Sequence, residues 1–143
     1  MQYHDDTIDK EWFLNLLNSK NYTITNTSEP LTASATSTFC SWDIEATNQY
    51  GITYTFELKN RTDYDSHQYS DNICEPIKLE RSKDLSHSFL VSLFKDCYVV
   101  HRLDEPHTID TMRCQHTNNW DRTKWIKKIV HYTTDDKHRY QYT

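Results

Sequence analysis

Two alternating segments on either side of the only glycine constrain the fold of this chain more than any other sequence feature. From Phe39 to Thr47, apolar and polar side chains alternate, and the same alternation recurs from Ile52 to Lys59. Gly51 lies between the two segments, in a turn where glycine adopts a positive φ at little cost. We therefore predict an antiparallel hairpin that has one apolar face and one polar face.

Charged side chains gather on the polar face of this predicted hairpin. When the two segments are folded about their turn, Asp43 lies opposite Glu57, and Glu45 lies opposite Thr55. Lys59 comes two residues after Glu57 and therefore shares the same face. Two acids and a lysine are thus expected to meet on one side of the hairpin. In isolation, this pattern also fits the solvated face of a half-exposed hairpin.

A helix and a short strand are predicted before the hairpin. One stripe of apolar residues recurs at the helical period, and Asp6 or Thr7 is expected to cap the helix. The polar residues 18–21 end the helix, and the β-prone residues 22–26 follow. The stripe consists of Ile8, Trp12, Phe13, Leu16 and Leu17.

A polar loop at residues 60–71 is expected to lead into a second helix. Pro76 must lie in the first turn of this helix, because proline has no amide proton to donate inside a helix. We expect the helix to end near Ser86 and to turn Ile77 and Leu85 toward the sheet.

Further strands are predicted in the second half of the chain. Residues 89–94 are apolar on both faces, which is typical of a buried parallel strand, and residues 97–102 add an antiparallel strand at the edge. Residues 103–119 are expected to be irregular, whereas the β-branched and aromatic residues at 125–134 favour a strand. The last nine residues are polar, and we expect them to be mobile.

Length and charge limit the classes of protein that this chain can belong to. Its 143 residues fit a single domain, with a core at about 7–102 and a C-terminal extension at about 103–143. The net charge of -5 disfavours bulk coating of nucleic acid, although positive charge is in excess in the extension. No apolar run is long enough to span a membrane and no signal peptide is recognisable, so we expect a cytoplasmic protein without a membrane partner. The four cysteines contain no CxxC pair, which gives no support for a zinc ribbon.

The order of the predicted elements, with the acids on the hairpin, resembles the PD-(D/E)XK nuclease superfamily. Asp43 matches the lone acid of that motif, and Glu57-x-Lys59 matches its (D/E)-x-K part, while Trp42 replaces the proline. The resemblance covers roughly residues 7–102. It implies an α/β, three-layer restriction-endonuclease-like core with a mixed sheet: helix, three-strand meander, helix, strand, strand. A β-rich C-terminal extension would follow this core.

The resemblance also implies a site for phosphodiester hydrolysis. That reaction needs a nucleophilic water near neutral pH and a cation to neutralise transition-state charge, which carboxylate-bound Mg²⁺ or Mn²⁺ provides. By analogy, Asp43, Glu57 and the main-chain carbonyl of Leu58 would hold the metal ion. Lys59 would orient the attacking water or help to deprotonate it. Arg61, which we expect just past the strand, could hold a phosphate oxygen.

Other residues are candidates for contact with the substrate. Lys78 and Arg81 share one flank of the second predicted helix, where similar families often place a basic residue that faces the site. Glu45 is either an additional metal ligand or a surface charge. A C-terminal group places basic side chains among aromatic ones, which suits base stacking and phosphate binding, unless its tryptophans pack against the core and its lysines stay in water. This group is Trp120, Arg122, Lys124, Trp125, Lys127 and Lys128.

Three functional hypotheses follow from these patterns. The first is a small Mg²⁺-dependent or Mn²⁺-dependent nuclease that acts on DNA in phage or mobile-element biology, with a homodimer as an expected assembly. The second is a nucleic-acid-binding or protein-binding module that keeps the same fold without catalysis. The third is a small β-rich interaction protein whose acids lie only at the surface.

Overall fold

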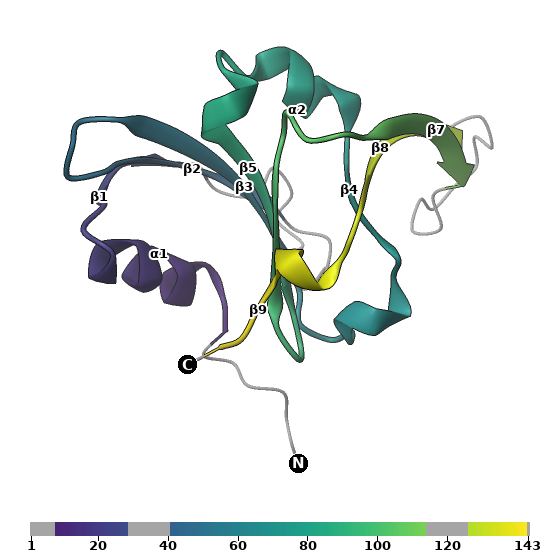
Figure 1. Ribbon diagram of the computed structural model, residues 1–143, viewed down its shortest axis with the longest axis horizontal. Coiled ribbons are helices and arrows are strands. Elements are labelled where there is room, and N and C mark those ends of the chain that lie inside the picture. Colours follow the sequence, from purple (N-terminus) through teal and green to yellow (C-terminus); the bar gives the residue numbers. More distant parts are fainter. Residues whose placement is uncertain (1–7, 29–40, 114–125, 143) are drawn as a thin grey trace.

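The computed structural model describes residues 8–28, 41–113 and 126–142 (Figure 1). Within these ranges the chain is mixed α/β and rich in sheet, as the sequence predicts. The described α-helices and strands, in chain order, are α1 Lys10–Ser19, β1 Thr23–Thr27, β2 Ser41–Thr47, β3 Thr53–Arg61, β4 Asp71–Cys74, α2 Pro76–Arg81, β5 Ser88–Phe94, β6 Tyr98–Arg102, β7 Thr108–Arg113, β8 Ile126–Thr133 and β9 Arg139–Tyr140. Short 3-10 helices occur at η1 Ser66–Gln68, η2 Leu85–His87 and η4 Asp136–His138.

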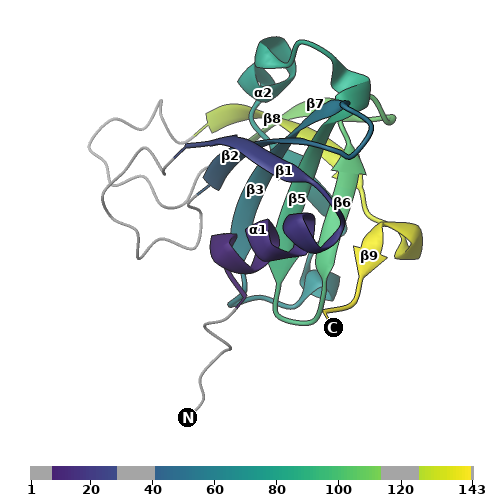
Figure 2. The same ribbon diagram turned by 90° about the vertical axis from the view of Figure 1, so that its left-hand side faces the viewer.

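The strands form two sheets that pack against each other. The larger sheet has the order β1-β2-β3-β5-β6-β9, and the smaller one has the order β4-β8-β7. In the larger sheet β3 and β5 are parallel, and the other neighbouring pairs are antiparallel. The predicted mixed sheet, with its parallel pair, is therefore confirmed. Figure 2 shows α1 across one face of the larger sheet, while the smaller sheet and α2 lie on the other side.

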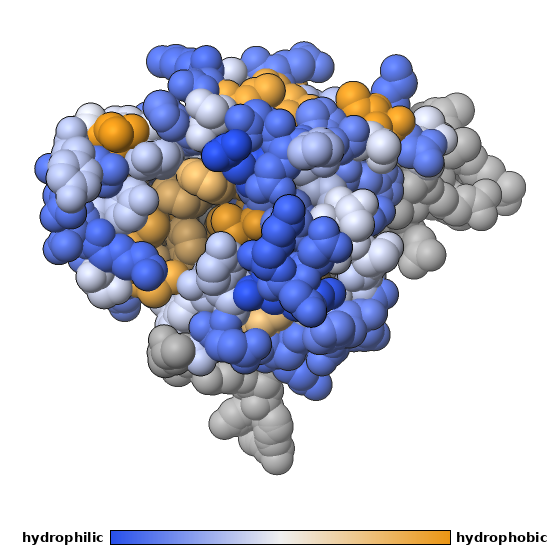
Figure 3. All heavy atoms as spheres, viewed as in Figure 1, coloured by the Kyte–Doolittle hydropathy of each residue, from blue (hydrophilic) through white to orange (hydrophobic). Residues whose placement is uncertain are grey.

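Helix α1 covers the apolar face of the larger sheet. Its N-cap is Asp9, whose carboxylate accepts a hydrogen bond from the Trp12 amide, so the predicted caps Asp6 and Thr7 were wrong. Phe13 and Leu17 are buried in a core with apolar residues of β2, β3 and β5. Figure 3 shows a hollow between α1 and the hairpin in which apolar side chains reach an otherwise largely hydrophilic surface. No described helix meets the length and apolarity that a membrane crossing requires.

The hairpin of β2 and β3 has the predicted register. Asp43 pairs with Glu57, and Glu45 pairs with Thr55. Gly51 adopts a φ of 84°, the left-handed conformation that the turn requires. Ile52 is an exception to the predicted apolar face, because it lies in the turn and is 38% exposed.

The opposite face of the larger sheet is only partly covered by the smaller sheet. Leu90 of β5 packs there in a second core with Cys74, Val130 and Tyr132 from the smaller sheet, and with Leu103. Strand β5 is therefore buried on both sides, as its uninterrupted apolar sequence predicts.

The region between the hairpin and β5 differs from the single helix that we predicted. Pro76 does begin α2, but the helix ends at Arg81, and a separate 3-10 turn contains Leu85. Ile77 does not face the sheet and is 42% exposed; Leu79 packs against the second core in its place. The polar loop is present at residues 62–70, where it contains a 3-10 turn, but it does not lead directly into α2, because β4 starts at Asp71 and pairs with β8.

Two expectations for the C-terminal region were wrong and one is confirmed. Strand β8 lies where the sequence predicts it, but residues 108–113, expected to be irregular, pair with β8 as β7. The residues expected to be mobile include β9, which pairs with β6. Strand β9 is therefore the edge strand of the larger sheet, and β6 is not. The Tyr142 ring lies against Trp12 and Tyr98, and its hydroxyl donates to the Phe94 carbonyl. Aromatic packing thus orders this polar segment.

Candidate functional site

Asp43 and Glu57 face each other on the side of the hairpin that is turned away from α1. Their positions follow from the alternation along β2 and β3, whose neighbouring apolar residues Ile44 and Phe56 are buried against α1. The main chain at Asp43 is fixed by Ser28, whose hydroxyl accepts a hydrogen bond from the Asp43 amide at 3.0 Å. The Asp43 side chain is 56% exposed, whereas the Glu57 side chain is 5% exposed.

Lys78 of α2 reaches both acids. Its Nζ lies 3.1 Å from Oε1 of Glu57 and 3.7 Å from Oδ1 of Asp43. Arg81, three residues further along α2, is also in this region, and its positive charge helps to lower the pKa of Asp43. The sequence-based hypothesis that the flank of Lys78 and Arg81 faces the two acids agrees with these positions.

The two carboxyl groups have opposite pKa shifts. Burial, together with the neighbouring Asp43 carboxyl, raises the pKa of Glu57 to about 7, against the opposing charges of Lys59 and Lys78. Contact with the Glu57 carboxyl, together with the charges of Lys78 and Arg81, lowers the pKa of Asp43 although partial burial opposes this. Within the described residues, neither Glu57 oxygen accepts a hydrogen bond, so the Lys78 ion pair is its main compensation.

A cavity of about 600 Å³ opens over this polar face. Its floor comes from β1, β2 and β3, and its wall comes from α2 and the segment that leads to β5. Both acids, Lys78 and Arg81 line it, and so does Glu45, whose carboxylate accepts a hydrogen bond from Thr25 at 2.8 Å. The other polar lining residues are Asn26, Ser28, Thr53, Thr55, Ser82, Lys83, Asp84, His87 and Ser88.

Lys59 lies beside this cavity but does not line it. It pairs with Ser92 of β5, whose hydroxyl donates to Asn72 of β4, so this part of the face lies beneath the smaller sheet. Burial lowers the pKa of Lys59, although the Glu57 charge opposes the shift. Among the described residues, none forms a hydrogen bond or an ion pair with its amine. The lysine of the Glu57-x-Lys59 pattern is therefore half-buried near the Glu57 carboxyl, outside the cavity lining.

Arg61 and Leu58 occupy buried positions. Arg61 is the last residue of β3 instead of lying past the strand, it is 8% exposed, and it is absent from the cavity lining. The structure thus contradicts an accessible phosphate contact at Arg61. The side chain of Leu58 is fully buried in the core beneath α1, which leaves only its main chain for the role that the resemblance implies.

The predicted C-terminal basic group is only partly described. Lys128 is exposed on β8, in the smaller sheet. The side chain of Lys127 lies outside the described part of the structure, as do Arg122, Lys124 and both tryptophans of the group. Their contact with nucleic acid stays a prediction.

Sequence reasoning missed a histidine cluster between β6 and the C-terminal segment. The rings of His101 and His138 stack with centroids 3.9 Å apart. Nε2 of His101 donates to the Thr133 carbonyl at 3.0 Å, and its Nδ1 accepts from Asn72 at 3.1 Å. Nε2 of His138 is 2.8 Å from the Glu105 carboxylate, and its Nδ1 accepts a hydrogen bond from the Asp135 amide. All four ring nitrogens therefore have protein partners, which accounts for the cluster without a metal ion.

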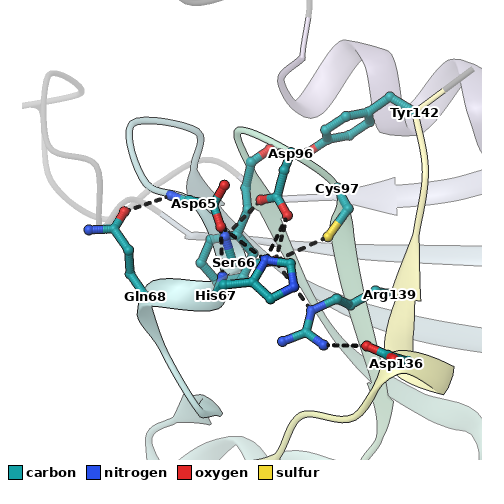
Figure 4. Close-up of polar contacts among 10 residues, drawn as sticks. Asp65, Ser66, His67, Gln68, Asp96, Cys97, Asp136, Arg139 and Tyr142 are labelled. Atoms are coloured by element: carbon teal, nitrogen blue, oxygen red, sulfur yellow. Dashed lines mark hydrogen bonds and ion pairs between the residues drawn. The ribbon is translucent and has the colours of Figure 1, made fainter.

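A second cluster that the sequence did not reveal lies at the turn between β5 and β6 (Figure 4). Nδ1 of His67 is 3.1 Å from Asp65 and 3.5 Å from Asp96. Asp96 accepts hydrogen bonds from both the amide and the hydroxyl of Ser66, each at 2.7 Å, and the hydroxyl also accepts from Arg139 at 3.3 Å. These contacts hold η1 against the turn. In each cluster at least one essential partner is distant in sequence, Asp96 in this one and His138 in the other, so the local pattern alone could not indicate it.

Comparisons with models of protein families, with curated proteins and with solved structures found no match to this chain.

Proposed function

We propose that this protein is a metal-dependent nuclease, with DNA as its substrate. The observation that carries the proposal is the buried Glu57 carboxyl group, which faces Asp43 in an open cavity and whose only partner by charge among the described residues of α2 is the Lys78 ammonium, with no geometric hydrogen bond to either oxygen. A buried carboxyl without donors is costly unless it binds a cation or serves chemistry. The perturbed pKa of Glu57 supports the same interpretation.

The topology supports a restriction-endonuclease-like core. Helix α1 precedes the β1-β2-β3 meander, α2 follows it, and β5 returns parallel to β3. Asp43 lies on the second strand, and Glu57 and Lys59 lie on the third, as in the family that the sequence resembles. Two features add to this order. Helix α2 has only six residues, and the smaller sheet, which contains β4, packs on the same face of the larger sheet.

The residues present fit a hard divalent cation. Carboxylate and carbonyl oxygens are the preferred ligands of Mg²⁺ and Mn²⁺, and Asp43 and Glu57 offer carboxylates from adjacent strands. We propose these two acids and the Leu58 carbonyl as the ligands. When bound, the ion would act as a Lewis acid and lower the pKa of a water molecule.

The side chains around the acids have distinct proposed roles. Lys59, whose pKa is lowered by burial, would hold or accept a proton at Nζ as water attacks. Arg81 would hold phosphate oxygens in the cavity by paired hydrogen bonds. Lys128, together with Arg122, Lys124 and Lys127, would contact the DNA backbone.

A cleavage assay with a matched acid control tests this proposal. Plasmid, linear and branched DNA are incubated with Mg²⁺, with Mn²⁺ or with a chelator. We expect cleavage only with metal, and we expect Asp43→Asn to lower the rate by about 10³-fold, because one of two charged ligands is lost. Glu11→Gln is the control, since Glu11 is an exposed acid on α1. Equal rates for Asp43→Asn and the wild type would refute the assignment of the site.

The Lys78 ion pair favours a second candidate, a binding module without catalysis. Its ammonium already compensates both acids, so the fold does not need a metal ion there. DNA binding that persists in chelator, with no cleavage under any divalent ion, would support this alternative.

A further inference from the structure

The position of Lys78 raises a question about how the acid pair binds a cation. Its Nζ is within 4 Å of one oxygen from each acid, and the side chain is 16% exposed. The acids belong to the hairpin, but the lysine belongs to α2, so the contact joins two separate elements. Of the described basic residues, Lys78 alone forms an ion pair with either acid.

A divalent ion on these oxygens would lie close to the Lys78 ammonium in its present position. Two positive charges a few ångströms apart in a poorly solvated site repel each other strongly, so both cannot keep these contacts. The side chain has four rotatable carbon bonds, and its ammonium can leave without movement of the helix.

We propose that Lys78 is an internal counter-ion that occupies the acid pair in the metal-free protein and is displaced when a divalent ion binds. This proposal rests on the proposed metal site at Asp43 and Glu57. The displaced ammonium stays tethered to α2, which lines the same cavity, and it is then available to a phosphate group beside Arg81. By linkage, a phosphate that binds the released ammonium strengthens metal binding, and the metal strengthens phosphate binding equally.

The test measures Mn²⁺ affinity by titration calorimetry, without substrate. Lys78→Met keeps the aliphatic chain but removes the competing charge, so we expect Mn²⁺ to bind at least about tenfold more tightly than in the wild type. Lys78→Arg, which keeps a positive charge, should stay near the wild-type affinity. Lys83→Met is the matched control, because Lys83 lines the same cavity without an ion pair to either acid, and it should change affinity by less than about threefold.

The outcomes separate this proposal from the proposed function. If the wild type binds Mn²⁺ and Lys78→Met binds it equally or more weakly, the counter-ion role is wrong although the metal site stands. If neither protein binds Mn²⁺, the metal site itself fails, and displacement by metal fails with it.

A second measurement detects the counter-ion in the absence of metal. At pH 8, Lys78→Met should melt at a lower temperature than the wild type, because it leaves Glu57 uncompensated, and adding Glu57→Gln should restore the melting temperature. If Lys78→Met does not fold, Lys78→Gln replaces it, and its melting temperature is compared with that of the double variant Lys78→Gln and Glu57→Gln. Destabilisation that Glu57→Gln does not relieve would overturn the counter-ion role.

Discussion

The acid site around Glu57 and the histidine network around His101 each contain a buried polar side chain, but the hydrogen-bond partners of these two side chains differ. The histidine network has a hydrogen-bond partner on each ring nitrogen, and Ser92 and Asn72 extend it between the sheets. In the acid site, by contrast, the Glu57 oxygens lack hydrogen bonds from the described residues. A satisfied network stabilises the fold, whereas an unsatisfied carboxyl group beside a cavity is the feature on which the proposed metal site rests.

Loss of a network residue should have the largest effect on stability. His101→Ala removes a ring that is 1% exposed and leaves the Asn72 amide and the Thr133 carbonyl without their partner, so we expect a loss of about 3 kcal/mol. Urea unfolding at pH 7 measures this loss. His67→Ala, at an exposed histidine, should cost less than about 1 kcal/mol. Similar losses for the two variants would show that the buried network stabilises the fold no more than an exposed histidine does.

Lys59 should show the opposite behaviour, with a large effect on rate and a small one on metal binding. Lys59→Met keeps the packing of the aliphatic chain but removes the amine that we assign to the water. Cleavage should slow by about 10²-fold. Mn²⁺ affinity should stay near the wild-type value, because the amine is not a ligand. A variant that cleaves as fast as the wild type would show that the Glu57-x-Lys59 match arose by chance.

The ionised Glu57 carboxylate should lower the free energy of unfolding. The pKa of Glu57 determines the sign of the pH dependence of this effect. The folded protein holds the Glu57 proton up to a pKa of about 7, above the ordinary value of 4.5, so stability falls as pH rises between these values. We expect Glu57→Gln to stabilise the metal-free protein by about 2 kcal/mol at pH 8 and by little at pH 4.5. Unfolding curves at both pH values check this difference. Equal stability at pH 8 would mean that Lys78 compensates the charge fully.

The C-terminal basic group should give the smallest change in binding for each residue. If Arg122, Lys124, Lys127 and Lys128 contact phosphates, replacing all four by alanine should reduce the salt slope of DNA binding by roughly 0.7 to 0.9 per contact. Binding measured at several salt concentrations gives this slope. An unchanged slope in the folded variant would restrict DNA contact to the residues around the acid site.

Local patterns explain which parts of the fold could be predicted from the sequence. Alternation and the position of Gly51 determine the hairpin register, and with it the pairing of Asp43 with Glu57. The double-sided apolar pattern of β5 predicts its parallel partner. These features depend on neighbours that are close in sequence or on burial alone.

The parts that could not be predicted depend on distant pairings. Strand β4 has only four residues, and it pairs with β8, where Cys74 lies opposite Val130 and Asp71 opposite Thr133, so no local period indicates it. This sheet packs against Ser92, the β5 residue that pairs with Lys59, and neither Lys59 nor Arg61 lines the cavity. For the same reason the sequence could list Lys78 as a candidate but could not place its ammonium between the acids.

The contact of Tyr142 with Trp12 has a consequence for folding during synthesis on the ribosome. The two rings pack edge to face at 5.1 Å, and they come from opposite ends of the described chain. Because domains synthesised from the N-terminus fold as their residues emerge, α1 and the hairpin are available long before this last partner. The Trp12 side chain therefore lacks part of its cover until the segment that contains Tyr142 has been synthesised, and docking of that segment is a late step in folding.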